Sequence, residues 1–234
     1  MTTPFGPLHP SSRLLLGPGP SQISPRVLRA CATPLLGYLD PEYTRLMDET
    51  QVLLREVFET ANEWTFCAPG TGMAGMESAL VSMLEAGDPV LVCVHGVFGE
   101  RMVDICRRAG FAVTRVDAPW GEAVDPQKVQ DALTTTKPKL VAIVHAETST
   151  GVLQPLEEIG ALAHAAGALF LVDCVTSLGG VPVKIDERGI DLAYSGTQKC
   201  LGAPPSLSPM TFNAQAVAAF KARKTVVPSF YLDI

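Results

Sequence analysis

The sequence predicts an α/β fold in which a mostly parallel sheet lies between two layers of helices, a three-layer αβα arrangement. The first observation is that strand-like and helix-like segments alternate over most of the 234 residues. The second is that the strand-like segments are continuous apolar runs such as "PVLVCV" at 89–94, typical of strands covered on both faces. The third is a composition of 47% hydrophobic and 18% charged residues, which is enough apolar material for a large core.

The elements follow one another in an order that fits this fold. Residues 1–20 are rich in Pro, Gly and Ser and predict an extended N-terminal arm. A helical pattern begins at Pro25 and continues through 40–58, where Asp40 and Pro41 form a start signal. Strands are expected at 64–68, 89–94, 112–117, 139–146, 168–175 and 191–194. Helices are expected at 75–87, 99–110, 125–136 and 155–167.

Charge and hydropathy argue against two kinds of partner. The formal net charge of −6 disfavours nucleic acid, because phosphate binding needs clustered Lys and Arg. No run of about eighteen apolar residues occurs, so we expect no membrane span. The N-terminal segment has no charged start followed by a long apolar run, so we expect no secretory signal and a cytoplasmic protein.

The cysteines show no metal-binding or paired pattern. None forms a CxxC pair, and no Cys/His spacing suggests zinc, so we expect no metal site. We expect reduced cysteines that act as small core residues. They are Cys31, Cys67, Cys93, Cys106, Cys174 and Cys200.

Chemistry-bearing residues follow the ends of the predicted strands. In open parallel sheets, ligands bind beyond the carboxyl ends of the strands. Five segments should therefore gather along one edge of the sheet. They are "PGTGM" at 69–73, "HGVFG" at 95–99, "HAETSTG" at 145–151, "DCVTS" at 173–177 and "SGTQK" at 195–199.

Three features of these segments together favour one cofactor. The glycine-rich turn at 70–72 leads into a helix, whose N-terminus suits a phosphate. Asp173 ends an apolar strand and could pair with a cation, and Lys199 could be an amine held for covalent chemistry. Alone, each has an ordinary explanation: a plain turn, a helix cap or a solvated lysine. Pyridoxal 5'-phosphate (PLP) needs all three, and Phe98 offers a flat face for its ring, although core packing alone would also explain Phe98.

Seven segments carry a resemblance to a known family. They are "LLLGPGPSQISPRVL", "GTGMAGMESAL", "GVFGERMVDI", "HAETSTGVLQPL", "LVDCVTSLGG", "DLAYSGTQKCLGAPP" and "SFYLDI". In this order and spacing the chain resembles the class V, fold-type I, PLP-dependent aminotransferases. It looks most like the alanine–glyoxylate and serine–glyoxylate (serine–pyruvate) group. The resemblance implies a transaminase that moves an amino group from alanine or serine to glyoxylate or pyruvate, and a homodimer.

The resemblance also implies roles for individual residues. Lys199 would form the Schiff base and serve as general acid and base, and Asp173 would pair with the pyridine nitrogen. The phosphate would be held by Thr71, Gly72 and Gln198, with Met73 contributing its backbone N–H alone. The other implied contacts are Phe98 and Val175 on the two ring faces, Thr148 at the phenolic oxygen, and Gly19 in the N-terminal substrate-site loop.

Two departures from the family pattern affect these expectations. Family members continue beyond "SFYLDI" into a small domain that carries the arginine for the substrate carboxylate. We therefore expect an arm at 1–20, a PLP-binding large domain at 21–234 and no small domain. In addition, Ser206 stands where the family usually has glycine, which favours either strain in that turn or altered surroundings of the lysine.

Two alternative functions remain open from the sequence. Without the small domain, the chain could be an inactive large domain or one that binds only PLP. Related class V proteins include cysteine desulfurases, which need a cysteine on a mobile loop. That alternative ranks lower, because the cysteines here lie in predicted core segments or, at Cys200, directly beside the lysine.

Overall fold

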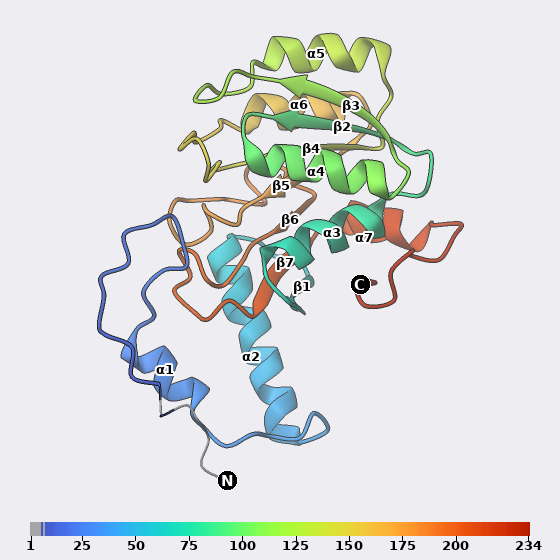
Figure 1. The fold of residues 1–234 in the computed structure, drawn as a ribbon. Helices are drawn as coiled ribbons and strands as arrows, with labels where there is room; N and C mark the ends of the chain where they lie inside the picture. Colours follow the sequence, from blue (N-terminus) through green and yellow to red (C-terminus); the bar gives the residue numbers. More distant parts are fainter. Residues whose placement is uncertain (1–5, 7) are drawn as a thin grey trace.

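A seven-stranded sheet lies at the centre of the computed structural model, which describes residue 6 and residues 8–234 (Figure 1). The strand order is β1-β7-β6-β5-β4-β2-β3. The five strands from β6 to β3 run parallel, and β7 is antiparallel to both β6 and β1. The strands are β1 (Trp64–Pro69), β2 (Pro89–Val94), β3 (Ala112–Asp117), β4 (Leu140–Val144), β5 (Leu169–Asp173), β6 (Leu192–Tyr194) and β7 (Leu207–Phe212). The predicted mostly parallel α/β sheet is confirmed.

Helices cover both faces of the sheet. The helices are α1 (Pro25–Cys31), α2 (Pro41–Phe58), α3 (Gly72–Met83), α4 (Val97–Arg108), α5 (Pro126–Thr135), α6 (Glu157–Ala165) and α7 (Ala214–Lys221). One core cluster joins α3, α4 and α7 to one face, and a second joins α5, α6 and the end of α2 to the other. Successive residues of β2 alternate between the two clusters, which explains why the strand is apolar throughout.

The N-terminal part differs from its predicted form in one respect. The predicted continuous helix from Pro25 is interrupted, since α1 ends at Cys31 and α2 begins only at Pro41. The Asp40 side chain accepts from the Glu42 amide and so starts a new helix. Within the predicted arm at 1–20, residues 1–5 and 7 lie outside the described residues; the described ones precede the first helix.

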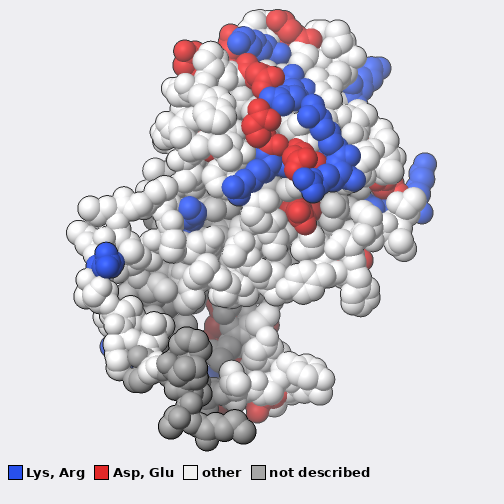
Figure 2. Space-filling model, viewed as in Figure 1, with Lys and Arg blue, Asp and Glu red and all other residues white. Residues whose placement is uncertain are grey.

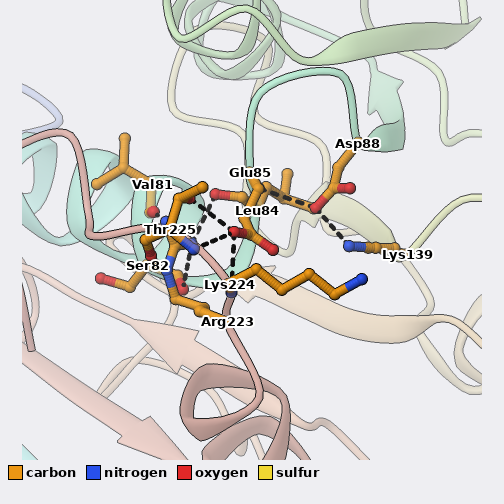
Figure 3. Close-up of polar contacts among 9 residues, drawn as sticks. All are labelled: Val81, Ser82, Leu84, Glu85, Asp88, Lys139, Arg223, Lys224 and Thr225. Atoms are coloured by element: carbon orange, nitrogen blue, oxygen red, sulfur yellow. Dashed lines mark hydrogen bonds and ion pairs between the residues drawn. The ribbon is translucent and has the colours of Figure 1, made fainter.

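Helix α3 ends earlier than predicted, and a distant arginine explains where. The helix stops at Met83 rather than at Gly87. Arg223 Nη1 donates to the carbonyls that end it, those of Val81 (3.1 Å), Ser82 (3.0 Å) and Leu84 (2.7 Å) (Figure 3). The last carbonyls of a helix lack intrahelical partners, and a cation is favourable there.

The side chain of Glu85, just after α3, also binds the segment that follows α7. Glu85 Oε1 accepts from the amides of Lys224 (3.0 Å) and Thr225 (2.7 Å) and from the Thr225 hydroxyl (2.6 Å) (Figure 3). Farther along, Ser78 Oγ in the middle of α3 donates to Leu232 O at 2.7 Å. The segment after α7 is therefore fastened along α3, the helix whose other end lies at the candidate site.

Charged side chains are unevenly spread over the surface. Figure 2 shows acidic and basic side chains interleaved in a band over the part of the molecule that carries α4 and β3, while the lower half of this face is largely uncharged. On α4 and β3, Arg115 pairs with Glu100 and Asp117, and Arg108 pairs with Asp104. No helix among the described residues is long and apolar enough to cross a membrane.

Candidate active site

The turn between β1 and α3 presents the start of a helix to the edge of the sheet. Gly70 has a φ of 124°, a conformation that favours glycine. Thr71 is the N-cap, and its side chain makes no capping hydrogen bond. As the first amides of the helix, those of Gly72 and Met73 have no intrahelical acceptor, and they lie at the positive end of the helix dipole. This end of α3 suits an anion.

Asp173 is a buried carboxylate at the end of β5. Its exposed fraction is 1%, Oδ1 accepts from the Val175 amide at 2.8 Å, and Oδ2 accepts from the Tyr194 hydroxyl at 2.7 Å. Burial raises the pKa of Asp173 to about 6, since an ionised group loses its hydration there. A cation beside this carboxylate would favour its ionised form, which is the property needed to pair with a protonated ring nitrogen.

Lys199 lies in a loop after β6 and is half-buried. Its Nζ donates to Pro18 O at 2.8 Å, so the N-terminal arm reaches the lysine. A Cβ on Gly19, which has a φ of 137°, would lie 2.6 Å from both Cδ and Nζ of Lys199. Ser21 fastens the arm there, because Ser21 Oγ donates to Lys199 O at 2.6 Å and Ser21 N donates to Gln198 O at 2.8 Å.

One cavity of about 150 Å³ gathers most of the residues singled out by the sequence. Its lining is Thr71, Gly72, Met73, Met76, Phe98, Arg101, Asp173, Val175, Gln198 and Lys199. The predicted convergence of strand ends on one edge therefore occurs in the structure. Gly72 is required where it is, because a Cβ there would meet Val175 Cγ2 at 2.7 Å.

The Gln198 side chain shows that the cavity has unused hydrogen-bonding capacity. Its buried Oε1 has no hydrogen-bond partner among the described residues. A Cβ built on Gly196 would lie 2.9 Å from this atom and 3.3 Å from the Gly72 amide nitrogen, so the amide group and the start of α3 lie close together. Buried polar groups normally find partners, and rotation of the amide would present a donor instead. The residues present therefore fit a phosphate group such as that of PLP.

Thr148 lies beside this cavity rather than in its lining. Its hydroxyl forms a hydrogen bond with the Thr176 hydroxyl. It lines a neighbouring cavity of about 410 Å³, together with Pro18, Glu147 and Cys200. The structure thus places Thr148 and the arm next to the lysine, while Gly19 contacts the lysine directly.

Four residues of the site were missed by sequence reasoning. Tyr194 pairs in register with Asp173 across β5 and β6, and "DLAY" next to a strand-end carboxylate was the available signal. Glu147, in "HAETSTG", is 1% exposed, and no periodic pattern in the sequence indicates that this carboxylate is buried. Met76 and Arg101 follow the cavity-lining residues Gly72 and Phe98 by one helical turn. The Arg101 guanidinium lies 4.7 Å from the centre of the Phe98 ring.

The remaining expectations about individual residues have mixed outcomes. Ser206 does not have a positive φ, so the expected strain in its turn is wrong; Ser206 O accepts from the Gly70 amide at 2.9 Å. Cys93, Cys106 and Cys174 are buried as expected, whereas Cys67 is half-buried and Cys31 and Cys200 are exposed. Cys200 Sγ donates to Thr176 O at 3.3 Å and so stays beside the lysine loop.

Comparisons with known proteins agree with this geometry. Residues 14–207 match the model of the family Aminotransferase class-V. Alanine–glyoxylate aminotransferase of Rattus norvegicus is 45% identical over 228 residues, covering 97% of this chain and 55% of the relative. (S)-Ureidoglycine–glyoxylate transaminase of Bacillus subtilis is 43% identical over 214 residues, covering 92% and 51%.

A solved structure shows the same fold at high similarity. The crystal structure of alanine–glyoxylate aminotransferase from Nostoc sp. superposes with a TM-score of 0.95 and 48% identity, covering 98% of this chain and 61% of that one. The chain thus spans about half the length of the curated relatives it matches. It belongs to the class V aminotransferase family.

Proposed function

We propose that residues 1–234 form the cofactor-binding part of a PLP-dependent transaminase that moves an amino group from alanine or serine to glyoxylate or pyruvate. One observation carries the proposal: a single cavity brings Lys199, Asp173 and the N-terminus of α3 together. Glyoxylate occurs in the names of the two curated relatives, which supports it as the amino acceptor. Their amino donors differ, alanine in one name and (S)-ureidoglycine in the other.

The lysine and the aspartate would carry the central chemistry. PLP, when bound, supplies an electron sink that stabilises negative charge at the α-carbon of the amino acid. Lys199 Nζ is the amine that would hold the cofactor covalently; once the amine of the amino acid has replaced it there, the freed Nζ would take up and move the proton released at that carbon. Asp173 would stay ionised beside the ring nitrogen and keep that nitrogen protonated. Its contacts with Val175 and Tyr194 fix both carboxylate oxygens in place.

The other residues of the site would bind and orient. The Thr71 hydroxyl, the first amides of α3 and the Gln198 side chain would hold the phosphate. Phe98 and Val175 would flank the ring, and Thr148 would donate to its phenolic oxygen. The phosphate-binding residues and Asp173 lie at the edge of the sheet. A cofactor bound by both would hold the reacting carbon close to Lys199 Nζ.

The proposal is tested by asking whether Lys199 binds PLP covalently. When PLP is added to the chain, we expect a visible absorbance band, and reduction with borohydride should fix the cofactor mass on the peptide that contains Lys199. Lys199→Ala should abolish the band and the added mass, whereas the exposed control Lys137→Ala should keep both. A band that survives Lys199→Ala, or no band in the unmodified chain, would contradict the proposal. Amino transfer from alanine to glyoxylate then tests the reaction itself.

We also propose that the chain pairs with a second copy of itself. Helix α2 has eighteen residues, of which Leu54 and Phe58 are buried. Apolar side chains are exposed along it and in the segments before it, which is unfavourable in water unless a partner covers them. They are Leu35, Leu36, Tyr38, Leu39, Tyr43, Leu46, Met47, Val52, Leu53 and Val57. Light scattering should give twice the chain mass of 24.9 kDa, and a monomer would contradict the pairing.

A further inference from the structure

Helix α4 begins without a cap of its own. Its N-cap is Gly96, which has no side chain to accept from the first amides of the helix. Two side chains from the loop after β4 take that place. Ser149 Oγ accepts from the Val97 amide at 3.0 Å, and Glu147 Oε2 accepts from the Phe98 amide at 3.1 Å. An acceptor that carries negative charge is favourable at this end of a helix.

The other carboxylate oxygen of Glu147 holds its own loop. Oε1 accepts from the Ser149 hydroxyl at 2.7 Å and from the Ser149 amide at 3.1 Å. The Glu147 carbonyl accepts from the Gly151 amide at 2.8 Å, and the Thr150 hydroxyl donates to His95 O at 3.3 Å. One carboxylate thus joins the loop at 147–151 to the start of α4. We call these contacts the Glu147 clasp.

The clasp is built into the packing of the fold. Glu147 is 1% exposed, and burying a carboxylate is unfavourable unless it is fully hydrogen-bonded. Gly96 leaves it room, since a Cβ there would overlap with Glu147 Cγ. The backbone of Gly96 has an extended φ of 170°, so glycine is needed for close approach and not for backbone conformation.

The clasp connects two segments that the proposed function uses. Phe98, whose amide Glu147 binds, lines the cavity with Lys199. Thr148 is the residue next to Glu147. We propose that Glu147 is a positioning residue that fixes Phe98 and Thr148 relative to each other, so that one meets the face of the PLP ring and the other its phenolic oxygen. This inference rests on the proposed function.

Glu147→Gln is the variant that separates positioning from bulk packing. The side chain keeps its size, but the amide nitrogen cannot accept, so either the Phe98 contact or the Ser149 contact is lost. In the chain without cofactor, we expect faster amide hydrogen exchange at 96–99 and 147–151. With PLP, we expect the lysine-dependent absorbance band to persist, cofactor binding about tenfold weaker, and a smaller visible circular dichroism signal.

Two further variants complete the design. Ser149→Ala removes the acceptor of the Val97 amide and should act in the same direction with a smaller effect; it also serves if Glu147→Gln does not fold. The two substitutions together should be less than additive, because they share one network. The exposed control Glu122→Gln should match the unmodified chain in every measurement.

The outcomes distinguish this inference from the proposed function. If the unmodified chain forms no lysine-dependent band with PLP, the proposed function fails and the inference falls with it. If that band forms but Glu147→Gln exchanges amides at the normal rate, the clasp is overturned alone. If exchange is faster while cofactor affinity and circular dichroism are unchanged, Glu147 serves the fold only and the positioning role is overturned.

Discussion

The two ends of the candidate site are built in different ways. At one end, Asp173 is almost fully buried and held by Val175 and by Tyr194, its register partner on the next strand. At the other end, Lys199 is half-buried in a loop and touches Pro18, Gly19 and Ser21, about 180 positions earlier in the chain. The aspartate is fixed by β6 and by the turn that directly follows β5, whereas the lysine's surroundings depend on the arm docking onto the loop.

Substituting Asp173 should give the largest effect, because it changes the end that the sheet fixes. Burial raises the pKa of Asp173 to about 6 from its ordinary value of 3.8. The native state of the cofactor-free chain therefore binds the proton of this carboxyl group more tightly than the unfolded state does. The contribution of Asp173 to stability is therefore fully present below pH 4 and is lost, by about 3 kcal/mol, as the pH rises from 4 through 6. Asp173→Asn keeps the size and the contact with the Val175 amide, so the variant should lack this fall and be more stable at pH 8.

The same variant should lose activity while gaining stability. If the proposed function holds, amino transfer should drop by about 10²- to 10⁴-fold, since the charge that keeps the ring nitrogen protonated is gone. Chemical denaturation between pH 4 and pH 8 measures the stability, with the exposed Asp48→Asn as a matched control. A flat profile for the unmodified chain, or a less stable variant at pH 8, would show that the burial of Asp173 is not what sets this end apart.

The sequence predicted the sheet end of the site better than the lysine end. Continuous apolar strands and the rule that ligands bind at strand ends are enough to place Asp173 and the start of α3 at one edge. The family resemblance placed Gly19 in the N-terminal substrate-site loop, but its closeness to Lys199 was not predicted. Local patterns carry no information on which residues of an irregular arm meet a loop so far away in the chain.

Contacts between distant segments also explain what the sequence could not show about the helices. The pattern of α3 continues to Gly87, but Arg223 takes up the last carbonyls and the helix ends at Met83. Likewise, α4 begins at Val97 because Glu147 and Ser149 cap it from another loop. Sequence signals for helix ends are local, so caps supplied from elsewhere are invisible to them.

Substituting Ser21 tests how the arm holds the lysine end of the site, and the effect should be smaller than that of substituting Asp173. Ser21→Ala removes the hydroxyl contacts with Lys199 O (2.6 Å) and Gln198 O (3.1 Å) but keeps the backbone bond to Gln198 O. We expect a loss of about 1 kcal/mol in the free energy of unfolding, with faster amide exchange confined to Gly19, Ser21 and 197–201. The exposed arm variant Ser12→Ala should change neither.

The pattern of exchange in Ser21→Ala decides whether the two ends are independent. Since the sheet holds Asp173 without help from the arm, exchange at 173–175 should stay at the level of the unmodified chain. Faster exchange there would mean that arm docking also supports the sheet edge, and the contrast between the two ends would fail. Unchanged exchange everywhere would mean instead that the loop holds Lys199 without the arm. Only a change limited to the lysine end agrees with a site in which the sheet edge positions Asp173 and the arm positions Lys199.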